Sequence, residues 1–184
     1  MSEFETAASG NLMEKARSDP AAFVALYRQF RDPVYYYTYA RVGNPKDAED
    51  LVGQVFLNVL EDLDGYRDEG HFAAWIFTIA RARVADFYRR RKPLAGIEQI
   101  YGLCDPLQDP VELIIHAENL KSLGTLLHLL AEDEKELLRL RFSARLSFKD
   151  IASVLNRKES AIKMSYYRLM ERLQTQWERT NDRA

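Results

Sequence analysis

Hydrophobic residues recur at spacings of three and four along most of the chain, and no strand-like alternation is sustained. That spacing puts apolar side chains on one face of an α-helix. Proline and glycine residues interrupt the pattern at intervals and mark turns between helices. The pattern therefore predicts an all-α protein made of several amphipathic helices.

Three helices are predicted in the first half of the chain. Asp19-Pro20 is a capped start for the first, and we expect Pro33 to kink or break it. Asn44-Pro45 opens a second helix, and a third runs from about His71 to Arg91 and stops before a proline. We predict one bundle over residues 19–92, after an N-terminal tail of residues 1–18. The apolar positions expected in its core include Phe23, Leu26, Phe30, Tyr37, Leu51, Val55, Phe56, Val59, Leu60, Phe72, Ile76, Ala80 and Val84.

The periodicity disappears over residues 93–110. This stretch holds three prolines and two glycines, and all its charged residues are acidic. Such a composition is typical of a flexible linker. Its Cys104 is the single cysteine, which excludes an internal disulfide, and we interpret it as a small hydrophobe. Helical periodicity resumes afterwards, so residues 111–184 are predicted to form a second small helical domain.

The second domain contains a short helix, a tight turn and a longer basic helix. Ser147 is a good N-cap with Asp150 three residues later, and Asn156 suits a left-handed helix end. A new helix begins near Lys158 and continues with apolar residues at core spacing. This order predicts a helix-turn-helix, whose second helix enters the DNA major groove. The alternative is an ordinary helical hairpin.

Composition narrows the class of protein. The 184 residues are 47% hydrophobic and 29% charged, which is ordinary for a globular protein. No segment approaches the roughly 20 apolar residues that span a bilayer, and the N-terminus lacks the features of a secretory signal. We therefore expect a cytoplasmic protein without membrane insertion.

Charge is spread unevenly behind a formal net charge of -2. Residues 44–69 carry eight acidic side chains against two basic ones, whereas residues 71–92 carry six basic side chains against Asp86 alone. Residues 156–173 hold five basic and two acidic side chains. A local excess of Lys and Arg is what a phosphate backbone requires. The alternative is that these runs are solvated helix faces.

Two long segments together resemble a known family. Residues 44–92, which include DLVGQVF, are similar to the first conserved domain of extracytoplasmic-function sigma factors of the sigma-70 family. Residues 130–173, which include LSFKDIASVLN, are similar to their second domain. The resemblance implies a protein that binds core RNA polymerase and promoter DNA and directs transcription initiation. It leaves open whether an anti-sigma factor is a further partner.

The resemblance also implies roles for individual residues. The helix that docks on polymerase corresponds to the one with Asp47, Glu49, Asp50, Gln54 and Phe56. Its Gly53-Gln54 departs from the commoner Gln followed by an acid. The reader of the minus-ten element corresponds to a turn and helix with Tyr66, Arg67, His71, Arg81, Arg83 and Arg89, whereas Trp75 is interpreted as a core residue. The reader of the minus-thirty-five element corresponds to Lys158, Lys163, Met164, Tyr167 and Arg168.

Other classes explain less of the sequence. A free-standing helix-turn-helix regulator would account for the second domain but not for the acidic helix or the linker. A polymerase adaptor would leave both basic helices as solvated faces. For an enzyme, the three histidines lack metal-ligand spacing and no glycine-rich phosphate loop is present. We therefore expect no catalytic residues, no metal and no cofactor.

Overall fold

The computed structural model describes residues 12–67, 70–90 and 123–181, and all regular structure in these ranges is helical. We call residues 12–90 the N-terminal half and residues 123–181 the C-terminal half. Residues 12–16 and 123–128 are helical. The remaining elements are α2 (Pro20–Val42), α3 (Pro45–Asp62), α4 (Phe72–Arg90), α6 (Glu132–Leu138), the π-helix η1 (Arg139–Ser143), α7 (Phe148–Leu155) and α8 (Glu159–Asn181). The predicted all-α class is confirmed.

Local capping accounts for where the N-terminal helices begin. The Asp19 carboxylate accepts a hydrogen bond from the Ala21 N–H at 2.9 Å, and Asn44 Oδ1 accepts one from the Asp47 N–H at 3.1 Å. Each cap satisfies a donor that the first helical turn leaves unpaired. Gly43 ends α2 with a left-handed φ of 69°, a conformation that glycine adopts without steric cost.

Pro33 does not break α2, which runs uninterrupted from Pro20 to Val42. Of the predicted kink or break, the break does not occur. Phe30, Val34 and Tyr37 are buried on either side of Pro33, and the proline itself is buried. Their packing holds the helix together although proline cannot donate the hydrogen bond of that turn.

The tail predicted for residues 1–18 already enters the fold at its end. Met13 and Ala16, in the helical turn of residues 12–16, are 2% and 6% exposed and pack in the core. The predicted linker over residues 93–110, with Cys104, lies outside the described residues.

The C-terminal half contains the predicted helix-turn-helix. Ser147 Oγ accepts the Asp150 N–H at 3.1 Å and donates to the Asp150 carboxylate at 2.5 Å, so α7 starts as predicted. Asn156 ends α7 in the left-handed region with φ 50°, and α8 follows at Glu159. Apart from glycine, asparagine is one of the residues that tolerate this left-handed conformation best, and this allows a short turn.

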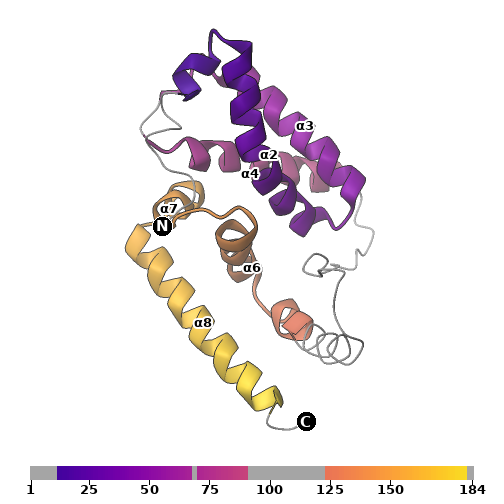
Figure 1. Cartoon of the computed structure of the whole chain (residues 1–184). Coiled ribbons are helices and arrows are strands. Elements are labelled where there is room, and N and C mark those ends of the chain that lie inside the picture. Colours follow the sequence, from indigo (N-terminus) through magenta and orange to yellow (C-terminus); the bar gives the residue numbers. More distant parts are fainter. Residues whose placement is uncertain (1–11, 68–69, 91–122, 182–184) are drawn as a thin grey trace, which may run out of the picture.

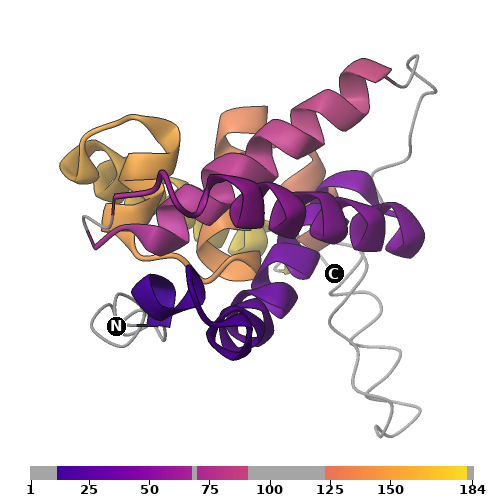
Figure 2. The same cartoon turned by 90° about the horizontal axis from the view of Figure 1, so that it is seen from above.

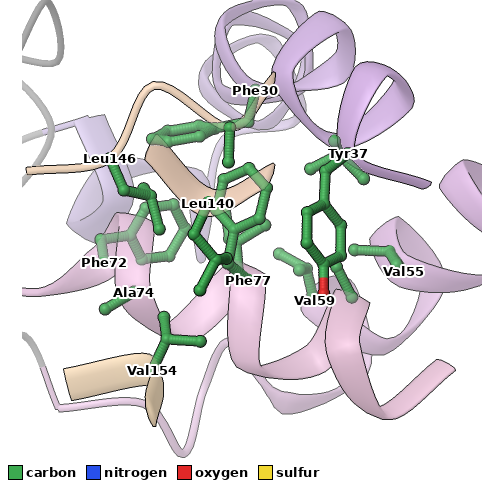
Figure 3. Packing of buried hydrophobic residues seen from close by; sticks show 14 of the residues in the cluster. Phe30, Tyr37, Val55, Val59, Phe72, Ala74, Phe77, Leu140, Leu146 and Val154 are labelled. Carbon is green, nitrogen blue, oxygen red and sulfur yellow. The ribbon is translucent and has the colours of Figure 1, made fainter. Parts of the chain in front are cut away.

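The two halves pack against each other around one continuous core. Helix α4 contacts α7, and α2 contacts η1. Figure 1 shows α7 next to one end of α4, and Figure 2 shows the same apposition from above. In Figure 3, Leu140 and Leu146 of the C-terminal half lie among Phe30, Phe72 and Phe77 of the N-terminal half. All five side chains are at most 3% exposed.

Candidate docking and nucleic-acid interfaces

The outer face of α3 is acidic with an apolar end. Glu49 and Asp50 are exposed, Gln54 is exposed one turn after Asp50, and the face continues to Leu57 and Leu60 at 61% and 52% exposure. Leu60 had been expected in the core, but it lies on the solvent side of the helix. A row of carboxylates next to two exposed leucines suits a partner surface that is both basic and apolar.

The other two residues predicted for this face differ in their surroundings. Asp47 lies in the first turn of α3, where a negative charge is favourable near the helix N-terminus. Phe56 is 5% exposed and packs edge-on against Tyr27, with ring centroids 4.7 Å apart. Its side chain is part of the core, so Phe56 is corrected from a docking residue to one that holds α3 on α2.

An aromatic group surrounds the turn before α4. Tyr66 stacks on Trp75 with centroids 4.4 Å apart and meets the edge of Phe72 at 5.5 Å. Arg17 donates a hydrogen bond to the Tyr66 carbonyl, which ties residues 12–18 to this turn. Trp75 packs against the core, in line with its interpretation as a core residue. Arg67 is exposed beside the group.

The basic residues of α4 differ in their surroundings. Arg83 lies 3.2 Å from the Asp86 carboxylate, and Arg89 also pairs with it. The hydrogen bond from Arg89 is the main reason that the pKa of Asp86 is lowered. This internal acid offsets part of the positive charge of the predicted DNA-contacting face. Arg81 instead points toward the C-terminal half.

The second helix of the helix-turn-helix presents its candidate residues to solvent. Met164 and Tyr167 are 54% and 62% exposed, and Lys158 and Arg168 are also exposed. Lys163 pairs with Glu159 at 2.6 Å, and this hydrogen bond raises the pKa of the lysine. The structure thus brings all five predicted residues of this element to one end of α8.

Glu136 forms an ion cluster between the halves that sequence reasoning missed. Its carboxylate accepts a hydrogen bond from Tyr37 Oη at 2.7 Å and from Arg41 at 3.1 Å. Arg81 and Arg139 lie 3.6 and 3.7 Å away. Burial raises the pKa of Tyr37, and the Glu136 charge raises it further, so the phenol stays protonated as a donor.

Glu136 is 6% exposed, and among the described residues no other charged residue is buried. A buried charge is stable only when it is paired and hydrogen-bonded. The available sequence signal was its position beside Leu137 and one turn before Leu140, a carboxylate on an apolar stripe. The residues that satisfy it are 95 and 99 positions away in sequence, which local patterns do not reveal.

A second polar contact joins the halves at the predicted DNA-reading turn. His71 Nδ1 lies 3.5 Å from the Asp150 carboxylate, the same side chain that interacts with the Ser147 cap. Both side chains are largely covered, at 28% and 15% exposure. The start of α4 is therefore attached to the first helix of the helix-turn-helix.

Within the described ranges, no three His, Cys, Asp or Glu side chains are grouped so that they could hold a metal ion. None of the helices described is long and apolar enough to cross a membrane.

Residues 26–93 match the family described as sigma-70 region 2. The chain is 32% identical over 166 residues to the ECF RNA polymerase sigma factor BldN of Streptomyces coelicolor, a match that covers 88% of this chain and 63% of the relative. It is 23% identical over 170 residues to SigW of Bacillus subtilis, which covers 87% of this chain and 91% of the relative.

Solved structures agree on the fold. CnrH, in its complex with the cytosolic domain of CnrY, aligns with a TM-score of 0.62 at 19% identity, over 93% of this chain and 95% of CnrH. The sigma factor RpoE of Bartonella quintana aligns with a TM-score of 0.59 at 20% identity, over 85% of this chain and 96% of that chain.

The helical fold, the helix-turn-helix and these relatives together define the class. The chain belongs to the extracytoplasmic-function sigma factors of the sigma-70 family, and its function is to direct transcription initiation.

Proposed function

We propose that the two halves divide the work of a sigma factor. The exposed face of α3, with Glu49, Asp50 and Gln54, docks on core RNA polymerase. The turn at Tyr66 and helix α4 hold the opened minus-ten element, and α8 reads the minus-thirty-five element in duplex DNA. The observation that carries this proposal is the exposure of Met164 and Tyr167 on the second helix of a helix-turn-helix, in a chain whose other half matches sigma-70 region 2.

The proposed chemistry differs between the two DNA elements. Opened bases need flat partners, and Tyr66 with the arginines of α4 offers aromatic and guanidinium planes beside a basic track for the backbone. Duplex DNA needs side chains that reach base edges, and Arg168 and Lys163 have the length and charge for such contacts. Lys158 stands at the helix start, where a phosphate contact sets register rather than sequence.

We expect no catalytic activity, because the relatives are sigma factors, which are not enzymes. The proposed place of action is the cytoplasm, where polymerase and promoter DNA are found. The Bartonella quintana relative was solved with the anti-sigma factor NepR, and we propose a protein of that kind as a further partner.

The test uses the full chain with purified core polymerase and a genomic promoter library. We expect weak, salt-sensitive DNA binding by the chain alone, because melting bases costs about a few kcal/mol per flipped nucleotide. Core polymerase should add specific binding, run-off transcripts and permanganate-reactive thymines near the start site. Tight binding of the chain alone to a palindrome as a dimer, without melting when polymerase is added, would instead identify a free-standing regulator.

A further inference from the structure

A short segment before the matched family region reaches the turn that carries Tyr66. Residues 12–18 precede the part of the chain that matches sigma-70 region 2, and the Arg17 guanidinium donates a hydrogen bond to the Tyr66 carbonyl, 49 positions away in sequence. Met13 and Ala16 of the same segment are buried in the core. Apolar side chains therefore anchor the segment, and its one contact to Tyr66 that can be named is made by a charged group.

The backbone of Tyr66 is held on both sides of its Cα atom. Its N–H donates to the Asp62 and Leu63 carbonyls at the end of α3, at 3.1 and 3.3 Å. Its carbonyl accepts the hydrogen bond from Arg17, and Tyr66 itself lies outside any helix. Because two planar peptide groups meet at each Cα atom, holding both of them sets the direction of the side chain between them.

The direction of the Tyr66 side chain determines where its ring lies. The ring stacks on Trp75 with an interplanar angle of 29° and a centroid distance of 4.4 Å, and it meets the edge of Phe72. Phe72 and Trp75 belong to α4, so the stack depends on how the turn is held against that helix. Aromatic pairs interact favourably only over a limited range of separation and offset. Loss of the Arg17 bond should therefore displace the Tyr66 ring relative to the indole.

The position of Arg17 suits control of the turn better than stabilisation of the fold. Arg17 is exposed, so its replacement removes no side chain from the core and leaves no cavity there. The free energy of unfolding should change little as a result. The Tyr66 carbonyl nevertheless loses the donor that ties it to residues 12–18.

We propose that Arg17 is a positioning residue of the minus-ten reader, which sets the turn so that the Tyr66 ring stands where it can meet an unstacked base. This inference rests on the proposed role of Tyr66 in holding the opened strand. Arg17 acts through the backbone of Tyr66 and not through a contact of its own with DNA. Residues 12–18 are then a functional part of the reader, although they lie outside the matched family region.

The test compares Arg17→Gln with Lys15→Gln, each in the full chain bound to core polymerase. Both variants remove one positive charge from an exposed position of residues 12–18. The probe is a fluorescent single-stranded oligonucleotide that carries the minus-ten sequence selected in the promoter-library experiment. We expect Arg17→Gln to bind it at least fivefold more weakly than the wild type, and Lys15→Gln to match the wild type. Equal affinity of all three forms would overturn the proposal.

A double-mutant cycle with Tyr66→Leu separates positioning from direct contact. If Arg17 acts through Tyr66, Arg17→Gln causes no further loss of affinity in the Tyr66→Leu background, and the salt dependence of binding stays the same. A direct phosphate contact would give the same loss in both backgrounds and would lower the salt slope by about 0.7. That result would refute the positioning role.

Trp75 fluorescence in the free chain gives a readout that needs no DNA. In a Trp177→Phe background Trp75 is the single tryptophan. Arg17→Gln should shift its emission to longer wavelength, because the indole loses the cover of Tyr66, and the denaturation midpoint should stay within error of the Lys15→Gln control. A lower midpoint with unchanged emission of the folded state would show a merely structural role and contradict the proposal.

A failure of the proposed function is seen separately. If the wild type with core polymerase neither binds the oligonucleotide nor opens a promoter, the sigma role of the Tyr66 turn is refuted. The Trp75 emission of Arg17→Gln still decides in that case whether Arg17 positions the Tyr66 ring.

Discussion

At the scale of single residues, two glycines of the N-terminal half have opposite structural roles. Gly53 lies within α3, and a Cβ added there would meet no atom within 4 Å. Gly43 ends α2 with a φ of 69° and donates its N–H to the Tyr39 carbonyl at 2.9 Å. The first glycine weakens a helix without a steric need inside this chain, whereas the second occupies a conformation that a Cβ disfavours.

We therefore predict that Gly53→Ala raises the free energy of unfolding by about 1 kcal/mol, and that Gly43→Ala lowers it by about as much. Chemical denaturation followed by circular dichroism measures both. A loss of stability in Gly53→Ala would mean that α3 is not a regular helix at this position.

At the scale of elements, α3 combines a buried face with an exposed acidic one. Val55, Phe56 and Val59 hold the helix in the bundle, and Glu49 and Asp50 take no part in that core. Binding and folding should therefore be separable on this helix. Gly53-Gln54 lacks the acidic residue of the commoner family pattern. Glu49 and Asp50, one turn earlier, are therefore the main source of charge complementarity on this face.

We predict that Glu49→Lys with Asp50→Lys strongly weakens binding to core polymerase in a pull-down at moderate salt, because it reverses charge on the docking face. Helical content should not change. The matched control is Asp62→Lys with Asp64→Lys, which makes the same change in charge at two exposed positions, the last residue of α3 and the turn that follows it. If both pairs lose affinity equally, net charge rather than the predicted face controls binding.

At the scale of the whole molecule, buried residues of both halves share one core, so we expect the halves to unfold as one cooperative unit. The two tryptophans, Trp75 and Trp177, lie one in each half and report on them separately. Leu140 is fully buried and lies beside Phe77 of the other half (Figure 3). A cavity at Leu140 should therefore destabilise both halves.

We predict that Leu140→Ala lowers the free energy of unfolding by about 2–5 kcal/mol. Single-tryptophan variants, Trp75→Phe and Trp177→Phe, should give the same denaturation midpoint as each other, both with and without the Leu140 change. Two separate transitions, of which Leu140→Ala moves only the Trp177 signal, would show that the halves unfold independently.

The features predicted correctly from sequence are those set by neighbours within a few residues. The caps at Asp19, Asn44 and Ser147 and the left-handed Asn156 depend on side-chain to backbone bonds that span two or three positions or on one residue's own φ. The same local rule allowed a break at Pro33, which does not occur because packing on both sides of the proline keeps the helix continuous.

The spacing of apolar residues also could not decide whether a given residue of a helix is buried or exposed. Phe56 and Leu60 both fit the apolar pattern of α3, yet one is 5% and the other 52% exposed. Periodicity predicts which residues form the apolar face of the helix. How much of that face is buried depends on how α2 and α4 pack against it.

The sequence by itself determined the helices, their caps, the helix-turn-helix and the segregation of acidic and basic residues, since all of these arise from local chemistry. Tertiary structure alone decided that one core joins the halves, that Glu136 is buried against Tyr37 and Arg41, and that Asp150 faces His71. These partners are 79 to 99 positions apart. Such contacts depend on how whole helices pack, and a charged residue in a helix looks the same in sequence whether it faces water or another domain.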